Sequence, residues 1–128
     1  MRFLIDTHLL LWAAGQPERL PPAARSLLEL PAHDLWFSAA SLWEIAIKRS
    51  LGRTDFRVDP AALRLGLVEH GYTELPIAGR HCLATEHLPA LHRDPFDRIL
   101  IAQAIVEGVT LLTADPQVAC YPGPIRSV

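Results

Sequence analysis

Several features that would assign this chain to a common class are missing from its sequence. Only two cysteines occur in 128 residues, Cys82 and Cys120, and they lie far apart in no paired motif. A disulfide scaffold or a zinc knuckle is therefore not expected, and a reducing cytoplasm fits the composition. The motifs HExxH, GxxxxGK and GxGxxG are absent as well, so neither a zinc protease nor a nucleotide-binding loop is indicated.

Net positive charge and long apolar runs are also lacking. A formal net charge of -2 gives no global basic field, so a nucleic-acid-binding protein of this composition would need local basic patches or bound cations. The apolar amino-terminal segment is broken by Asp6 and His8; it is too short for a membrane span and lacks the layout of a signal peptide, so no membrane association is expected. The hydrophobic fraction of 50% and the length of 128 residues predict one globular domain over 1–128.

Short apolar segments alternate with amphipathic ones along the whole chain. We expect strands over 2–5, 35–38, 72–77 and 109–115, with a further edge strand in 124–128. We expect helices over 7–14, 20–30, 38–50, 60–70, 78–91 and 96–108. This alternation predicts an α/β fold with a central parallel sheet of four to five strands and helices on both faces. Ligands in such folds bind beyond the carboxyl ends of the strands.

Acidic residues stand at or near these strand-to-helix junctions. Asp6 directly follows the first strand, and Asp115 follows the strand VTLLTA. Each of these two acids also suits the N-cap of a helix, and Asp115 is followed by a proline, which is favoured at the first helical position. Asp97 lies in the first turn of the helix that opens at Asp94-Pro95, where Asp94-x-x-Asp97 resembles a capping box. We assign the cap to Asp94, which leaves Asp97 to face the junction.

Glu44 lies in the first or second turn of the helix that contains SLWEIAIK. Ser41-x-x-Glu44 resembles a second capping box, and Glu44 could instead pair with Lys48 one turn on. Large apolar neighbours on both sides predict that its carboxylate is partly buried. Two carboxylates about 5 Å apart repel by ~3 kcal/mol at an effective dielectric of ~20. Four converging acids therefore require a cation, and all-oxygen ligands select Mg²⁺ or Mn²⁺.

Four blocks of the sequence, FLIDTHLLLW, SAASLWEIAIK, RDPFDRILIAQA and LLTAD, resemble the PIN-domain family in their order and spacing. They are most similar to its VapC branch, the toxins of bacterial and archaeal toxin–antitoxin pairs, and the resemblance covers residues 2 to 115. It implies a three-layer α/β/α sandwich and metal-dependent endoribonuclease activity. It also implies a homodimer in the cytoplasm and a cognate VapB-like antitoxin, whose carboxyl-terminal segment lies over the active-site groove.

The resemblance also implies roles for individual residues. The family's acidic quartet corresponds to Asp6, Glu44, Asp97 and Asp115, the expected catalytic and metal-binding residues. Thr7 and Thr113 match positions where the family carries hydroxyl side chains. No convincing protein nucleophile is present, so water activated by a metal ion is the economical mechanism. One ion or two, and transfer, ribosomal or messenger RNA as substrate, are all compatible with these residues.

Basic residues near the acids are candidates for phosphate contacts, which add affinity without reading sequence. Arg98 is the strongest of these because it adjoins Asp97; the others are Arg93 and the cluster Lys48, Arg49 and Arg53. The alternative for each is a solvated helix face.

Two rival functions use the same residues differently. An aspartyl-phosphate phosphohydrolase would use Asp6 as nucleophile, but related enzymes need a second aspartate where His8 stands. A catalytically inactive binding module of the same fold would leave four carboxylates unused, and these would only destabilise it. His8 is not assigned to the site, because we expect it on another helix face from Asp6. The tryptophans are not assigned to it either, because we expect them in the core or an interface.

Overall fold

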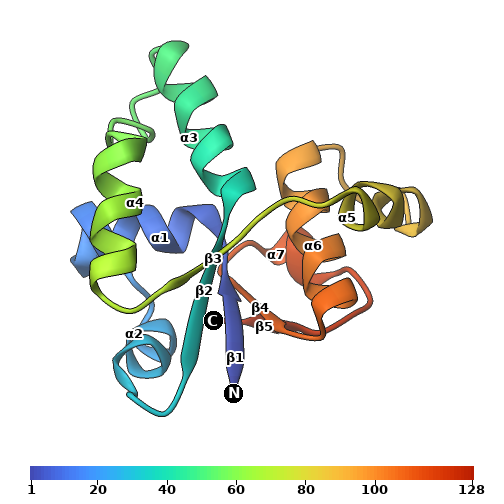
Figure 1. Ribbon diagram of the computed structural model, residues 1–128, viewed down its shortest axis with the longest axis horizontal. Coiled ribbons are helices and arrows are strands. Elements are labelled where there is room, and N and C mark those ends of the chain that lie inside the picture. Colours follow the sequence, from blue (N-terminus) through green and yellow to red (C-terminus); the bar gives the residue numbers. More distant parts are fainter.

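The protein, in a computed structural model that describes residues 1–128, has a five-stranded sheet with helices on both faces (Figure 1). The strands are β1 (Arg2–Ile5), β2 (Asp34–Ser38), β3 (Thr73–Leu75), β4 (Thr110–Thr113) and β5 (Ile125–Ser127). They lie in the order β3-β2-β1-β4-β5, and every pair is parallel. The predicted three-layer α/β/α sandwich with a central parallel sheet of four to five strands is confirmed, and the sheet has five.

The helices lie close to the positions that the sequence predicts. They are α1 (Thr7–Gly15), α2 (Pro22–Glu29), α3 (Ala39–Ser50), α4 (Pro60–Glu69), α5 (Gly79–Ala84), α6 (Pro95–Glu107) and α7 (Pro116–Ala119), with 3₁₀ turns over Pro17–Arg19 and Thr85–His87. The prediction of a single helix over 78–91 is wrong, because the chain changes there from α5 to a 3₁₀ turn and then to irregular structure. None of the helices combines the length and the apolar character that a membrane span would need.

The core consists of two apolar clusters, one on each face of the sheet. Phe3 and Ile5 point into the cluster under α1, α2 and α4, while Leu4 points into the cluster under α6. In β4, Leu112 and Leu111 divide between the two clusters in the same way. Successive strand residues face opposite sides, and both sides are covered, so these strands read as continuous apolar runs.

Chain order reverses at β1, which has β2 on one side and β4 on the other. Parallel strands bring their carboxyl ends to one edge, so the segments that follow β1, β2 and β4 meet there. At this edge β1 passes into α1, β2 into α3 and β4 into α7, with at most two residues between strand and helix. In Figure 1, α3 rises from the end of β2, with α1 and α4 on one side and α6 on the other.

Candidate active site

Asp6 is the residue between β1 and α1 and forms the N-cap of α1. Its Oδ1 accepts a hydrogen bond from the Leu9 backbone N–H at 3.1 Å, and its Oδ2 accepts one from the hydroxyl of Thr113, at the end of β4. The residue is 7% exposed. Burial raises the pKa of the Asp6 carboxyl above its ordinary value, although the two hydrogen bonds oppose the shift. Capping alone does not require a carboxylate this deeply buried, because exposed caps stabilise helices equally well.

Glu44 projects from the middle of α3 and is 2% exposed. The predicted burial is confirmed, and so is the pairing with Lys48, whose Nζ lies 2.6 Å from Glu44 Oε2. The other oxygen, Oε1, is buried with no hydrogen-bond partner. The structure therefore leaves one acceptor of Glu44 unsatisfied at this edge of the sheet, which is costly for a charged oxygen in the interior.

The capping box predicted for Ser41 and Glu44 is wrong, because α3 begins three residues earlier than that motif requires. Ser38 is the N-cap, and its hydroxyl accepts from the Ala40 N–H at 3.0 Å. Ser41 is instead buried beside α1, where its hydroxyl accepts a 2.9 Å hydrogen bond from Thr7. This contact joins the start of α1 to the turn of α3 that precedes Glu44.

Asp97 lies in the first turn of α6, as predicted, and Asp94 is the N-cap, with its carboxylate accepting from the Phe96 N–H at 2.9 Å. Asp97 Oδ2 lies 2.7 Å from His92 Nε2. The pKa of Asp97 is raised to about 6. Burial is the main cause, the charges of Asp94 and Glu44 act in the same direction, and the hydrogen bond to His92 opposes them.

Asp115 is the N-cap of α7 and accepts a 2.8 Å hydrogen bond from the Gln117 N–H. Its own backbone N–H donates to Thr113 Oγ1 at 3.0 Å. The Thr113 hydroxyl therefore connects Asp115 to Asp6, because it also donates a hydrogen bond to Asp6 Oδ2. Asp6 and Asp115 line one cavity of about 260 Å³ together with His8.

The structure thus gathers the predicted acids from four separated chain positions. Glu44 is the common neighbour, because its charge raises the pKa of both Asp6 and Asp97. Asp115 joins the group through Thr113 and the cavity that it shares with Asp6. All these side chains come from the carboxyl edge of the sheet or from the helices that begin there, as the parallel topology requires.

A divalent cation fits this donor set. Two basic side chains lie near the acids: Lys48 is bound to Glu44 and lies 3.8 Å from Asp94, and Arg19 lines the cavity with Asp6 and Asp115. Glu44 Oε1 has no partner, and burial, with a smaller contribution from the charge of Glu44, raises the pKa values of Asp6 and Asp97, so a cation here would stabilise the ionised carboxylates. Carboxylate oxygens with few other ligands suit Mg²⁺ or Mn²⁺.

One nearby residue was missed by reasoning from the sequence. His92, with Asp94 and Asp97, presents ligand atoms that all lie within 4.8 Å of one another. His92 and Asp97 are five residues apart, which is not a helical spacing of three or four. Residues 88 to 94 are neither helix nor strand, so no periodic pattern predicted the contact. The only signal was the proximity of a histidine to the DPFD motif.

His8 also lies nearer to the site than its spacing suggested. Positions two apart on a helix face different ways, but Asp6 is the cap and stands outside the helix, so both side chains line the same cavity. His8 also packs edge-on against Phe56, with ring centroids 5.4 Å apart, and its Nε2 is 3.6 Å from Asp55. His8 therefore packs against Phe56 and also lines the cavity of the acids, so the expectation that it faces away from Asp6 is wrong. Trp43, in contrast, is 58% exposed and is not in the core of the chain.

Arg98 is placed differently from the phosphate contact that we expected. Its guanidinium donates to the carbonyls of Thr85 and Pro89, each at 2.9 Å, and to the Tyr121 hydroxyl at 3.1 Å. These contacts tie α6 to the irregular segment before it. Both terminal nitrogens are engaged by the protein, so Arg98 has a structural role and its geometry does not favour phosphate binding.

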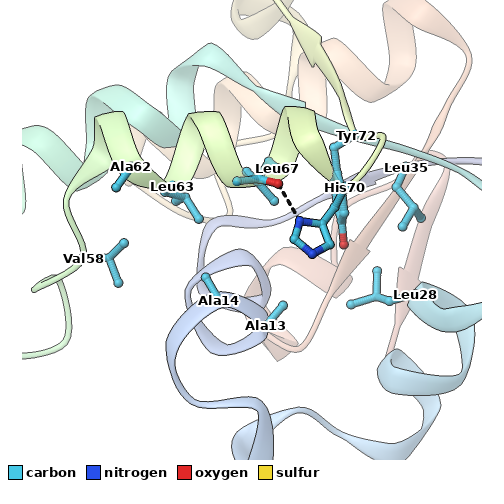
Figure 2. A pocket seen from close by; sticks show the side chains of 11 residues that line it. Ala13, Ala14, Leu28, Leu35, Val58, Ala62, Leu63, Leu67, His70 and Tyr72 are labelled. Atoms are coloured by element: carbon cyan, nitrogen blue, oxygen red, sulfur yellow. Dashed lines mark hydrogen bonds between the residues drawn. The ribbon is translucent and has the colours of Figure 1, made fainter.

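A second hollow, of about 610 Å³, lies away from the acids between α1, α2 and α4 (Figure 2). Its lining is mostly aliphatic, and Figure 2 shows Leu63 and Leu67 of α4 facing Ala13 and Ala14 of α1. His70 lies at one end with its Nδ1 2.7 Å from the Gly66 carbonyl. No acidic residue lines it, so this cavity suits apolar side chains rather than a cation or a phosphate.

The fold and the site together define a class, that of parallel α/β proteins with a cluster of carboxylates at the carboxyl edge of the sheet. The model of the family described as PIN domain matches residues 3–122, nearly the whole chain. The chain therefore belongs to the PIN domain family, and the predicted resemblance is confirmed.

Individual relatives agree with this assignment. The chain is 30% identical over 122 residues to Ribonuclease VapC22 of Mycobacterium tuberculosis (strain ATCC 25618 / H37Rv), an alignment that covers 94% of this chain and 92% of that protein. Its fold is similar to that in crystal structures of VapBC2 from Rickettsia felis, bound to a DNA fragment from the promoter (TM-score 0.74, 16% identity, 99% and 98% of the two chains). It is also similar to DNA-bound VapBC from Salmonella typhimurium (TM-score 0.66, 17% identity, 99% and 98%).

Proposed function

We propose that this protein is a metal-dependent endoribonuclease that hydrolyses RNA phosphodiester bonds with Asp6, Glu44, Asp97 and Asp115. The observation that carries the proposal is the unpartnered, buried oxygen of Glu44; its charge adds to burial, the main cause, in raising the pKa values of Asp6 and Asp97. The 30% identity to a protein named Ribonuclease VapC22 supports the same activity.

In this proposal Asp6, Glu44 and Asp97 hold Mg²⁺ or Mn²⁺, with Asp115 at the margin of the site. When bound, the cation supplies positive charge that activates water and stabilises the charge developing on the phosphate. The protein's own side chains set the geometry. Thr113 fixes the rotation of the Asp6 carboxylate by donating to its Oδ2, and Lys48 holds Glu44 through Oε2 and leaves Oε1 free.

The same geometry opposes the rival of an aspartyl-phosphate phosphohydrolase. The rival would use Asp6 as the nucleophile and would need an acid two positions on to protonate the leaving group, where this chain has His8. The residue two positions on, His8, packs against Phe56 and faces Asp55, so it does not replace the acid that such enzymes use to protonate a leaving group.

We further propose that the protein is the toxin of a VapBC-type pair, acts in the cytoplasm as a homodimer of one PIN domain over 1–128, and is inhibited by a VapB-like antitoxin. The solved relatives that share the fold are VapBC assemblies. The apolar cavity between α1, α2 and α4 is suited to apolar side chains of such a partner. Exposed Trp43 on α3 and Leu51, the residue that follows α3, are candidates for burial in the dimer.

The test is RNA cleavage by purified protein with Mg²⁺, with EDTA, and with Asp6→Asn, Glu44→Gln or Asp97→Asn. Cleavage by the wild type that is lost with EDTA and falls at least a hundredfold in each variant is expected, because one preorganised charged group is worth about that factor. The matched control is Asp59→Asn, the same change at an exposed N-cap, of α4, which is expected to cleave normally. Metal-independent cleavage, or unchanged rates in the three variants, would contradict the proposal. Release of phosphate from an aryl phosphate would favour the rival.

A further inference from the structure

His92 makes the only side-chain contact to Asp97 that the mechanism above does not use. The imidazole Nε2 lies 2.7 Å from Asp97 Oδ2, and both side chains are 20% exposed. A hydrogen bond of this length on one carboxylate oxygen fixes the rotation of the carboxylate and leaves Oδ1 for another ligand.

The backbone that carries His92 is held by side chains rather than by secondary structure. Residues 88 to 94 follow a 3₁₀ turn and precede α6, with no strand or helix among them. The His92 carbonyl accepts a hydrogen bond from the Tyr121 hydroxyl at 3.1 Å. The Arg98 guanidinium donates to the Pro89 carbonyl at 2.9 Å and to the same Tyr121 hydroxyl at 3.1 Å. Tyr121 is 4% exposed, so its hydroxyl is a buried anchor.

We propose that His92 is a positioning residue for the Asp97 carboxylate, and that Tyr121 and Arg98 act through it by fixing the segment 88 to 92. Without the imidazole, the carboxylate would turn away from the negative charges of Asp94 and Glu44, which already raise its pKa. The inference rests on the proposed function, because the carboxylate is positioned for the cation.

The arrangement predicts the size of the effect. Partners that orient a ligand from outside the coordination sphere are worth about tenfold to a hundredfold in metal affinity. We therefore expect His92→Leu to weaken Mn²⁺ binding about tenfold. His92→Gln retains an N–H that can donate to Asp97, so it is expected to restore part of the affinity. Tyr121→Phe loses one hydroxyl, keeps the ring in the core, and is expected to weaken binding less than His92→Leu.

The experiment measures Mn²⁺ affinity of the full chain by electron paramagnetic resonance titration, with thermal unfolding in EDTA to confirm that each variant is folded. The matched control is Tyr72→Phe, which removes a hydroxyl at the apolar cavity, away from the acids. The double variant His92→Leu with Tyr121→Phe is expected to bind no more weakly than His92→Leu alone, because Tyr121 acts only through His92.

Three results would overturn the inference. The first is a folded Tyr121→Phe protein that binds Mn²⁺ like the wild type. The second is additive losses in the double variant. The third is a nitrogen coupling from coordinated imidazole in the Mn²⁺ spectrum, absent in His92→Gln, which would make His92 a ligand. Failure of the wild type to bind Mn²⁺ would instead overturn the proposed function, and the inference with it, so the two failures are distinguishable.

Discussion

Replacing Asp97 by Asn is expected to stabilise the metal-free protein at pH 7.5 and to do so much less at pH 5. In the folded protein the pKa of Asp97 is raised from 3.8 to about 6, mainly by burial. At ~1.4 kcal/mol for each pKa unit, this difference corresponds to about 3 kcal/mol. Asparagine carries no charge, so the variant does not bear the cost of holding a carboxylate there.

The direction with pH follows from proton binding. Between pH values near 4 and 6, folded Asp97 binds more proton than unfolded Asp97, so the free energy of unfolding falls as pH rises through this interval. The cost is absent below the unfolded pKa and complete above the folded one. The hydrogen bond from His92 already lowers this pKa, so its contribution is included in the shift, and about 3 kcal/mol in favour of Asp97→Asn is expected at pH 7.5.

The assay is urea unfolding followed by circular dichroism in EDTA at both pH values. In a thermal scan of a chain of this length, the same difference of about 3 kcal/mol corresponds to roughly 12 °C in the unfolding temperature. Asp59→Asn, at an exposed helix cap, serves as the control and is expected to change stability by less than about 0.5 kcal/mol at either pH. Saturating Mg²⁺ is expected to reverse the order, because only the wild type gains the full binding energy.

Equal stability of Asp97→Asn and wild type at pH 7.5 in EDTA would refute this reasoning. So would a stabilisation of the same size at pH 5, since a pH-independent effect would come from packing and not from the charge.

Three further predictions test other parts of the structure. Gly108 ends α6 with φ of +66°, so Gly108→Ala is expected to lower the free energy of unfolding by about 1 kcal/mol. Gly66 lies inside α4 with open space around the new Cβ, so Gly66→Ala is expected to raise the free energy of unfolding by roughly 0.5–1 kcal/mol. Denaturant titration measures both changes. Thr113→Val keeps the shape but leaves the Asp115 N–H and Asp6 Oδ2 without partners, so a loss of about 1–3 kcal/mol is expected, together with weaker Mn²⁺ binding by calorimetry. Both cysteines are free and exposed, so two thiols are expected to react with a thiol reagent in the native protein, and dithiothreitol to leave its unfolding temperature unchanged.

The position of the site at one edge of the sheet has a chemical consequence. Asp6 and Asp115 are held by backbone N–H groups at helix starts, while Glu44 is held by Lys48 alone. The two caps are therefore rigid and Glu44 retains an unsatisfied oxygen. Under the proposed function, such a site would bind a cation with little reorganisation, because the carboxylates are already oriented.

The sequence alone predicted most of the elements and the four acids that we propose for the site. All five strands were predicted, and β1 and β4 most directly, because a strand buried on both faces is a continuous apolar run whatever its neighbours. Asp94-Pro95 and Asp59-Pro60 marked the starts of α6 and α4, because capping and proline at the first helical position depend only on local backbone geometry. The burial of Glu44 followed from its immediate apolar neighbours.

Tertiary structure decided what the acids contact and which neighbours serve them. His92 reaches Asp97 through a segment without periodic structure, and Arg98 turns to backbone carbonyls rather than to solvent. The Thr113 hydroxyl joins residues that are more than a hundred positions apart. Local patterns do not encode such contacts, because they arise only when the order β3-β2-β1-β4-β5 brings separate strand ends together. The pKa of Asp97 likewise depends on burial and on charges from two helices, which exist only in the folded protein.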